Sequence, residues 1–163
     1  MSYRVDFYKD KQKFSAAHFT LFNDGELERL HGHNYTVQVA LRGSQLQRGL
    51  LFPFHDVKPL INRLCDAWDE YVLLPAESDW VRLTEKGGQI EVEVTTPKHR
   101  KFYSFPHQDV VLLPCDNVSC ENLAMLMTRR LVQAFKEKDL SITEVEIILG
   151  ESKGQTVTFG SKL

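Results

Sequence analysis

The sequence predicts an α+β protein, with strands near both ends of the chain and two helices between them. Near each end, apolar and polar side chains alternate, as they do along strands with one buried face. Two internal segments instead repeat their apolar residues at helical spacing. The chain has 163 residues, which corresponds to one ordinary domain, residues 1–163, long enough to bury a sizeable core.

Two strands are predicted in the first quarter of the chain. They run from Tyr3 to Phe19 and from His31 to Arg42, and the polar loop 23–26, which contains a glycine, joins them. The second strand carries apolar residues at alternate positions, so one of its faces is expected to be buried.

A first helix is predicted to follow. Asp56 is placed to cap it, because an aspartate can accept a hydrogen bond from the free backbone N–H groups of a first turn. The helix is expected to stop near residues 69–71. Its apolar stripe consists of Val57, Leu60, Ile61, Leu64 and Trp68.

A β-rich insertion, from Asp79 to Pro114, is predicted between the two helices. Residues 81–84 and 90–94 flank a Gly-Gly pair at 87–88, which is typical of a β-hairpin turn. A second helix is expected to start at Ser119, and its stripe is interpreted as core and not as a cofactor site. A closing hairpin of strands 144–149 and 155–159 follows, around residues 150–154. The stripe of the second helix consists of Leu123, Leu126, Met127, Arg130 and Leu131.

The composition excludes several classes of protein. The net charge of −2 comes from mixed signs without a basic stripe, so nucleic acid is not an expected partner. No apolar run approaches the length of a membrane span, and residues 1–6 lack the apolar core of a signal peptide, which predicts a cytoplasmic protein. Three cysteines without a C-x-x-C pair are expected to be reduced and buried; they are Cys65, Cys115 and Cys120.

The motif H-G-H, formed by His31 and His33, is the most informative feature of the chain. Residues i and i+2 of a strand point to the same face, so these two imidazoles can converge. His18 ends the preceding strand-like segment, and three imidazoles with an open fourth position are typical of a catalytic zinc site. Gly32 favours the close approach of a ligand or of another backbone segment, and Glu28 adds a carboxylate just upstream. The alternative is that these histidines are merely packed or hydrogen-bonded.

Four motifs, in this order along the chain, resemble those of the 6-pyruvoyltetrahydropterin and 6-carboxytetrahydropterin synthase family. They are F-S-A-A-H at 14–18, L-H-G-H-N-Y-T-V at 30–37, S-C-E-N-L-A at 119–124 and L-G-E-S at 149–152. The resemblance covers most of the chain except the insertion. It implies the tunnelling fold, which is a four-stranded antiparallel sheet with two helices on one face. It also implies a trimer or a dimer of trimers, with active sites between subunits.

The resemblance further implies a ligand set and a substrate. The zinc ligands of the family correspond to His18, His31 and His33, and the substrate would be dihydroneopterin triphosphate or a close relative. Glu151 matches the carboxylate that holds the pterin, which suits a group able to accept two parallel hydrogen bonds. The segment that lines the pterin pocket corresponds to Ser119, Cys120 and Glu121.

Two departures from the family pattern affect the expected chemistry. Most members have a catalytic cysteine at the position of Leu27, and leucine cannot transfer protons. Glu28 instead gives E-x-x-H-G-H, which resembles a variant class where glutamate is the general base and the product is 6-hydroxymethyl-dihydropterin. The alternative is an ordinary surface carboxylate. The family's Asp-His pair reads Asp69-Glu70 here, so these two residues are either an altered proton relay or plain carboxylates at a helix end.

Three functions therefore fit the sequence. The first is a zinc-dependent pterin lyase that breaks a carbon–oxygen or carbon–carbon bond in the substrate side chain, to a 6-hydroxymethyl-, 6-pyruvoyl- or 6-carboxypterin product. The second is a related enzyme of changed substrate, in which the insertion reshapes the pocket mouth. The third is a non-catalytic pterin or purine binder on the same scaffold.

Overall fold

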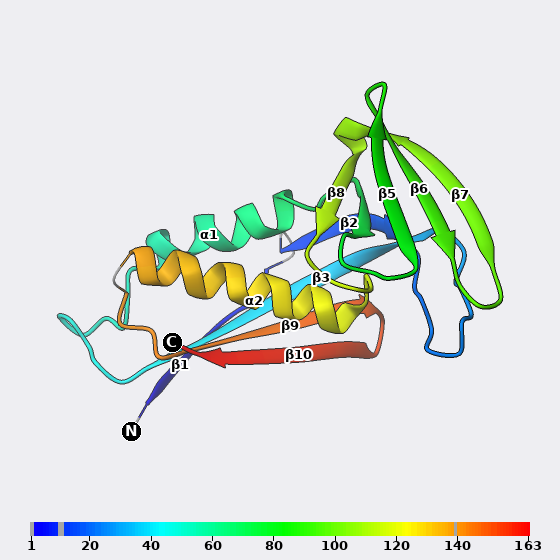
Figure 1. Ribbon diagram of the computed structural model, residues 1–163. Helices are drawn as coiled ribbons and strands as arrows, with labels where there is room; N and C mark the ends of the chain where they lie inside the picture. The colour runs from blue at the N-terminus through cyan, green and yellow to red at the C-terminus, as the bar shows by residue number, and fades with distance from the viewer. Residues whose placement is uncertain (1, 10–11, 139) are drawn as a thin grey trace.

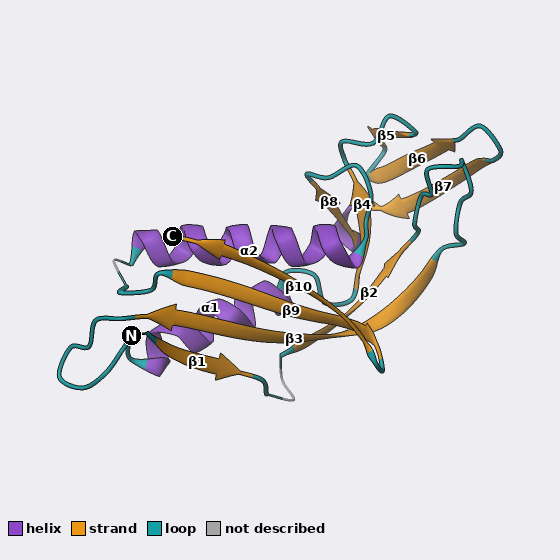
Figure 2. Cartoon of the chain, turned by 90° about the horizontal axis from the view of Figure 1, so that it is seen from below, coloured by secondary structure: helices purple, strands orange, loops and turns teal. Residues whose placement is uncertain are grey.

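Two helices, α1 (Phe54–Asp66) and α2 (Cys120–Glu137), pack against one face of a β-sheet in the computed structural model of the protein (Figure 1). The structure describes residues 2–9, 12–138 and 140–163. A second, smaller sheet stands at one end of the molecule (Figures 1 and 2). This arrangement confirms the predicted α+β class. No helix among the described residues has both the length and the apolar character that a membrane crossing requires.

The main sheet contains seven strands within the described residues, in the order β10-β9-β3-β2-β4-β8, with β1 paired to β3 beside β2. The antiparallel part confirms the predicted sheet, except that two strands, β1 and β2, replace its first strand, and β4 and β8 extend it in parallel. The strands are β1 (Tyr3–Phe7), β2 (Lys13–His18), β3 (His31–Gly43), β4 (Tyr71–Pro75), β8 (Val110–Leu113), β9 (Glu144–Ser152) and β10 (Gln155–Lys162).

The prediction of one continuous strand from Tyr3 to Phe19 was wrong. β1 pairs with the end of β3, from Phe7 opposite Val39 onward, whereas β2 pairs with its beginning. The sequence between them is polar from residue 9 to residue 12, so it offers no apolar side chain to the core face. Residues 10 and 11 of the predicted strand lie outside the described residues.

Asp56 does not cap α1, in contrast to the prediction. The N-cap is Pro53, and the helix begins at Phe54, three residues earlier than expected. Proline suits this boundary because its ring fixes φ and it has no N–H group to leave unpaired. Asp56 lies in the first turn, where its negative charge is favourable beside the positive end of the helix dipole.

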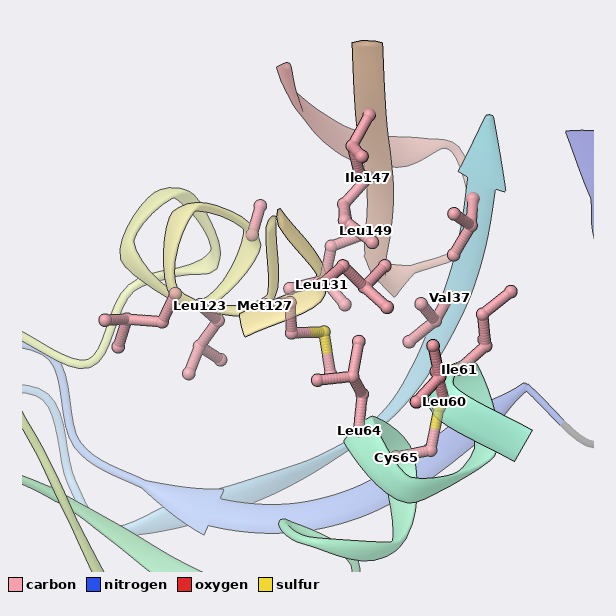
Figure 3. Close-up of a cluster of buried hydrophobic side chains, with 14 of the residues drawn as sticks. Val37, Leu60, Ile61, Leu64, Cys65, Leu123, Met127, Leu131, Ile147 and Leu149 are labelled. Carbon is pink, nitrogen blue, oxygen red and sulfur yellow. The ribbon is translucent and has the colours of Figure 1, made fainter. Parts of the chain in front are cut away.

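The main core lies between the sheet and the two helices, as Figure 3 shows. The apolar stripes predicted for both helices are buried there, so their interpretation as core is confirmed. Arg130 is the exception, because it lies at the exposed edge of the stripe and its guanidinium stacks 5.1 Å from the ring of Trp68. Core residues labelled in Figure 3 are Val37, Leu60, Ile61, Leu64, Cys65, Leu123, Met127, Leu131, Ile147 and Leu149.

The predicted insertion forms a three-stranded antiparallel sheet of β5 (Val81–Lys86), β6 (Gln89–Thr95) and β7 (Arg100–Pro106), followed by a short 3-10 helix, η1 (His107–Asp109). The predicted hairpin is confirmed, and Gly87 and Gly88 form its turn with φ of 59° and 77°. One face of this sheet covers a second core. That core consists of Phe19, Leu21, Leu27, Leu74, Ile90, Val92 and Val94.

The closing hairpin of β9 and β10 is longer than predicted. Its strands continue through most of the expected loop, which leaves only residues 153–154 in the turn. Ser152 pairs with Gln155, but Gly150 pairs with Thr156, so Glu151 is the extra residue of a β-bulge. A bulge changes the direction of a side chain, and here that side chain is the predicted pterin carboxylate.

Candidate functional site

Three histidines from two adjacent strands converge on the helix-covered face of the main sheet. His18 ends β2 and His31 begins β3, and the two are paired directly across the ladder. His33 lies two residues further along β3, on the same face. The three side chains offer ligand atoms that all lie within 4.8 Å of one another, and Nε2 of His31 and Nε2 of His33 are 2.9 Å apart. This spacing suits a single bound metal ion.

Backbone carbonyls fix the orientation of two of these rings. Nδ1 of His18 donates to the carbonyl of Val118 at 2.8 Å, and Nδ1 of His31 donates to the carbonyl of Arg29 at 2.6 Å. A ring whose Nδ1 carries the proton presents the lone pair of Nε2 to the site. Histidine ligands of metals are commonly held by such bonds.

Burial favours the neutral form of His18. Its side chain is almost fully enclosed, and loss of hydration lowers its pKa below the ordinary value of 6.5. Neutral imidazole is the form that binds metal ions. The most buried of the three histidines is therefore already in its ligating state at neutral pH.

Glu151 faces the same three rings from the bulge of β9. Its Oε1 lies 3.3 Å from Nε2 of His33 and 3.5 Å from Nε2 of His18. The hydroxyl of Tyr35 donates to the same oxygen at 3.3 Å. Tyr35 is fully buried and stacks on Phe14, so it is a rigid support for this carboxylate.

These residues open into a pocket of about 780 Å³. Ser119 and Cys120 line it at the start of α2, where Ser119 is the N-cap and accepts a hydrogen bond from the backbone N–H of Asn122. Glu121 lies in the first turn of the same helix and also lines the pocket. The remaining walls are formed by Thr20, Phe22, Glu28, His31, His33, Glu151, Gly154, Gln155, Thr156 and Val157.

Cys120 is not a reactive thiol in this environment. Burial, followed by the nearby charge of Glu151, raises its pKa to about 11. Cys65 and Cys115 are also free and buried, as predicted, and neither lines the pocket. A thiolate at neutral pH is therefore not part of the chemistry that this pocket offers.

Glu28 lines the pocket and Leu27 does not. Oε2 of Glu28 lies 3.9 Å from Nε2 of His31, and the carboxylate is about half exposed. Leu27 is buried in the second core beneath the three-stranded sheet. The acid–base group that this segment presents to the histidines is therefore the glutamate.

Asp69 and Glu70 lie outside the pocket that His31 and His33 line, although Glu70 and His33 both border a second, smaller depression of about 340 Å³. Asp69 accepts a hydrogen bond from the backbone N–H of Ser15 at 2.8 Å, and the N–H of Glu70 donates to the carbonyl of Ser15 at 2.6 Å. Both acidic residues line a separate depression with Ser15 and Asn34, whose side chains lie on the face of the sheet opposite the histidines.

Sequence reasoning missed seven residues of the site, which are Thr20, Phe22, Tyr35, Gly154, Gln155, Thr156 and Val157. Tyr35 could have been found, because the alternation that joins His31 to His33 continues to position 35. Thr20 and Phe22 line the pocket from the loop after β2, and no periodic signal in the sequence identifies them.

The chain is similar to known proteins over most of its length. The sequence pattern of the family described as 6-pyruvoyl tetrahydropterin synthase matches residues 8–162, a range that includes the segment interpreted above as an insertion. A protein of Methanocaldococcus jannaschii, provisionally named 6-carboxy-5,6,7,8-tetrahydropterin synthase, is 29% identical over 147 residues, which is 88% of this chain and 86% of that protein.

Solved structures of two other proteins superpose on all or nearly all of this chain. The crystal structure of 6-pyruvoyl tetrahydropterin synthase from Plasmodium vivax superposes with a TM-score of 0.90 at 27% identity, covering 100% of this chain and 99% of that one. The Plasmodium falciparum protein of the same name gives a TM-score of 0.89. Two further P. vivax structures carry alanine or cysteine in place of a glutamate that is described as a catalytic residue of that protein.

Proposed function

Because the chain belongs to the 6-pyruvoyl tetrahydropterin synthase family, we propose that it is a zinc-dependent pterin lyase that cleaves the side chain of dihydroneopterin triphosphate or a close relative. The observation that carries this proposal is the convergence of three histidines beside one pocket, which Glu28 also lines. The product that we expect is the 6-hydroxymethyl pterin.

The donor set supports zinc as the metal. Three imidazole nitrogens with backbone-fixed rings suit a catalytic zinc site, which leaves a position open for substrate. His18, His31 and His33 would hold the ion. The chemistry that zinc supplies, when bound, is acidification of the substrate's side-chain hydroxyl groups.

Glu151 is our candidate for the pterin anchor. A carboxylate can accept two parallel hydrogen bonds from the guanidine-like edge of a pterin ring. Tyr35 already donates to one of its oxygens, and the bulge at the end of β9 directs it into the pocket. Ser119, Cys120 and Glu121 would line the space beside the ring.

Glu28 is our candidate for the general base. We expect its carboxylate to take the proton of the C2′ hydroxyl, so that the C1′–C2′ bond breaks and its electron pair moves toward the pterin ring. The C2′ carbon leaves as an aldehyde, and C1′ takes up the proton to give the 6-hydroxymethyl pterin. A positioned base of this kind contributes roughly 10²- to 10⁴-fold to a rate. The catalytic glutamate of the P. vivax relative supports a carboxylate in this role.

We further propose that the working unit is a trimer or a dimer of trimers. Among the described residues, the main sheet ends in strand edges without a partner, which closure into a barrel would remove. Asp69 and Glu70 do not line the histidine pocket within one chain, so they would join that pocket across such a subunit boundary. Sedimentation at micromolar concentration tests this part, and a monomer contradicts it.

Product analysis tests the proposed reaction. Purified zinc-loaded protein would be incubated with dihydroneopterin triphosphate and the products separated and identified by mass. A 6-hydroxymethyl pterin supports the proposal. A 6-pyruvoyl or 6-carboxy product would support a pterin lyase but would contradict the proposed bond cleavage with Glu28 as base. Binding of the substrate without turnover would instead favour a non-catalytic pterin binder, and turnover only with another pterin would favour a changed substrate.

A further inference from the structure

The loop between β2 and β3 folds into a small hairpin that forms one wall of the pocket. Leu21 and Leu27 pair across it, the N–H of Phe22 donates to the carbonyl of Glu26 at 3.0 Å, and the N–H of Gly25 donates to the carbonyl of Phe22 at 2.8 Å. We call residues 20–28 the pocket hairpin. It supplies three residues of the pocket, which are Thr20, Phe22 and Glu28.

The base of the pocket hairpin is fixed by Asn117. Its side-chain amide donates to the carbonyl of Leu21 at 2.9 Å, and its amide oxygen accepts the N–H of Leu21 at 3.0 Å. The N–H of Glu28 donates to the carbonyl of Thr20 at 3.0 Å, which closes the base. These bonds fix the position of the base of the hairpin. The tip, residues 23–26, is held by other contacts.

The tip is held by the turn between β6 and β7, which belongs to the three-stranded sheet. Thr96 donates its hydroxyl proton to the carbonyl of Gly25 at 2.6 Å. The same hydroxyl accepts the N–H groups of Lys98 at 3.2 Å and His99 at 3.0 Å. The side chain is buried, and both lone pairs and the proton are used, so this hydroxyl has a fixed direction.

Charged groups add to this contact at the surface. Nζ of Lys98 lies 3.0 Å from carboxylate oxygens of both Asp24 and Glu26, and Nε2 of His99 lies 2.8 Å from the other oxygen of Glu26. Exposed ion pairs of this kind stabilise weakly. The buried hydroxyl of Thr96 is therefore the group that decides the geometry.

Glu28 has no side-chain anchor of its own among the described residues. Its carboxylate has one recorded polar contact there, the 3.9 Å approach to His31, and it takes its position from the backbone. A shift of the pocket hairpin would therefore move the carboxylate relative to the histidines.

We propose that Thr96 is a positioning residue that acts through the pocket hairpin to hold Glu28 at the reacting bond. The inference rests on the proposed function of Glu28 as general base. It assigns a role to the three-stranded sheet, because its β6–β7 turn contacts the hairpin that carries Glu28. Gly25 fits this contact because its φ is +85° and an added Cβ would lie 3.0 Å from the ring of Pro97.

Thr96→Val is the primary test, because valine keeps the shape and removes the hydroxyl. We expect kcat to fall between about 10- and 100-fold, as for a misplaced catalytic group, with KM and metal content unchanged. Thr96→Ser keeps the hydroxyl and should retain kcat. Thr84→Val is the matched control, because Thr84 is exposed on β5 of the same sheet. An unchanged kcat in Thr96→Val overturns the proposal.

A double substitution distinguishes the positioning of Glu28 by Thr96 from an effect of Thr96 on the rest of the protein. If Thr96 acts through Glu28, adding Thr96→Val to Glu28→Gln should lower kcat no further. An equal loss in both backgrounds would show that Thr96 acts elsewhere and would overturn the proposal.

Amide hydrogen exchange distinguishes failure of this proposal from failure of the proposed function. Thr96→Val should speed exchange at the amides of Phe22, Gly25 and Glu28, all of which are hydrogen-bonded within the hairpin, and Thr84→Val should not. If amide exchange in Thr96→Val is unchanged, Thr96 does not hold the hairpin, and this conclusion stands whether or not the variant is active. Faster exchange in a protein without pterin turnover supports the holding role and rejects the proposed function instead.

Discussion

Oε2 of Glu28 lies 3.9 Å from Nε2 of His31, and both side chains face the same pocket. The two residues are three apart in the sequence, and one closes the pocket hairpin while the other begins β3. A carboxylate this close to an imidazole of the proposed metal site, with no other polar contact among the described residues, would be free to accept a proton from a bound substrate.

Replacement of Glu28 by glutamine should lower turnover by roughly two to four powers of ten, because the amide keeps the shape but cannot accept the proton. Metal content and pterin affinity should stay close to those of the unchanged protein. Glu137→Gln serves as the control, because Glu137 is an exposed carboxylate at the C-terminal end of α2 and does not line the pocket. Steady-state kinetics with zinc-loaded protein would measure both variants, and equal turnover in Glu28→Gln and the unchanged protein rejects Glu28 as the base.

A cysteine should act differently at positions 27 and 28. Leu27 is buried in the second core, so Leu27→Cys should place a thiol away from the pocket and leave the product unchanged. Glu28→Cys should place the thiol beside the histidines, where a thiolate can replace the carboxylate as base. Mass analysis of the products of both variants measures the difference. A new product from Leu27→Cys alone would show that position 27 reaches the substrate.

We expect one zinc ion per chain. Replacement of His31 and His33 together by alanine should abolish stoichiometric binding, because one remaining imidazole cannot hold the ion. His55→Ala is the control, since His55 is exposed near the start of α1 and does not line the pocket. Metal analysis after gel filtration decides the outcome. Removal of zinc by a chelator should abolish turnover without unfolding the chain, because the main core lies between sheet and helices and does not depend on the metal.

The tip of the pocket hairpin should loosen in acid. Hydrogen bonds lower the pKa of Asp24, chiefly from the backbone N–H of Glu26, and that of Glu26, chiefly from His99 and then Lys98. Carboxylates with a depressed pKa in the folded state stabilise it above their ordinary values, here 3.8 and 4.5, and the contribution is lost as pH falls through the depressed values.

Amide protection at Gly25, corrected for intrinsic exchange, should therefore be constant near neutral pH and fall below about pH 4.5. Lys98→Ala should reduce this dependence, because the cation that both carboxylates share is gone. Protection that rises in acid would contradict the assignment of these ion pairs.

Much of the histidine site could be predicted from the sequence, and the reason is strand periodicity. The alternation of β3 places residues 31 and 33 on one face without further information. The pairing of His18 with His31 depends on the register of β2, which the sequence does not determine. The break between β1 and β2 was missed because alternation is present on both sides of a polar run.

Other features depend on contacts between distant segments. β4 follows α1 as a short apolar run, Tyr71–Pro75, and periodicity cannot tell such a run from the end of a helix. The backbone of Glu70 turns with φ of 64° and bonds to Ser15, which places Asp69 and Glu70 outside the pocket that His31 and His33 line. Neither the turn nor its partner has a signal in the local sequence.

The parallel pairing of β4 with β8 limits how the chain can be shortened. Val72 pairs with Val110 and Pro75 with Leu113, so after β4 the chain must return along the full strand before β8 can begin. A two-residue turn can join only antiparallel strands, whereas a parallel connection needs a dozen residues or more. A trimmed variant that replaced residues 76–109 by a tight turn would therefore lose the edge strand along with the small sheet, so this segment cannot be excised as a removable module.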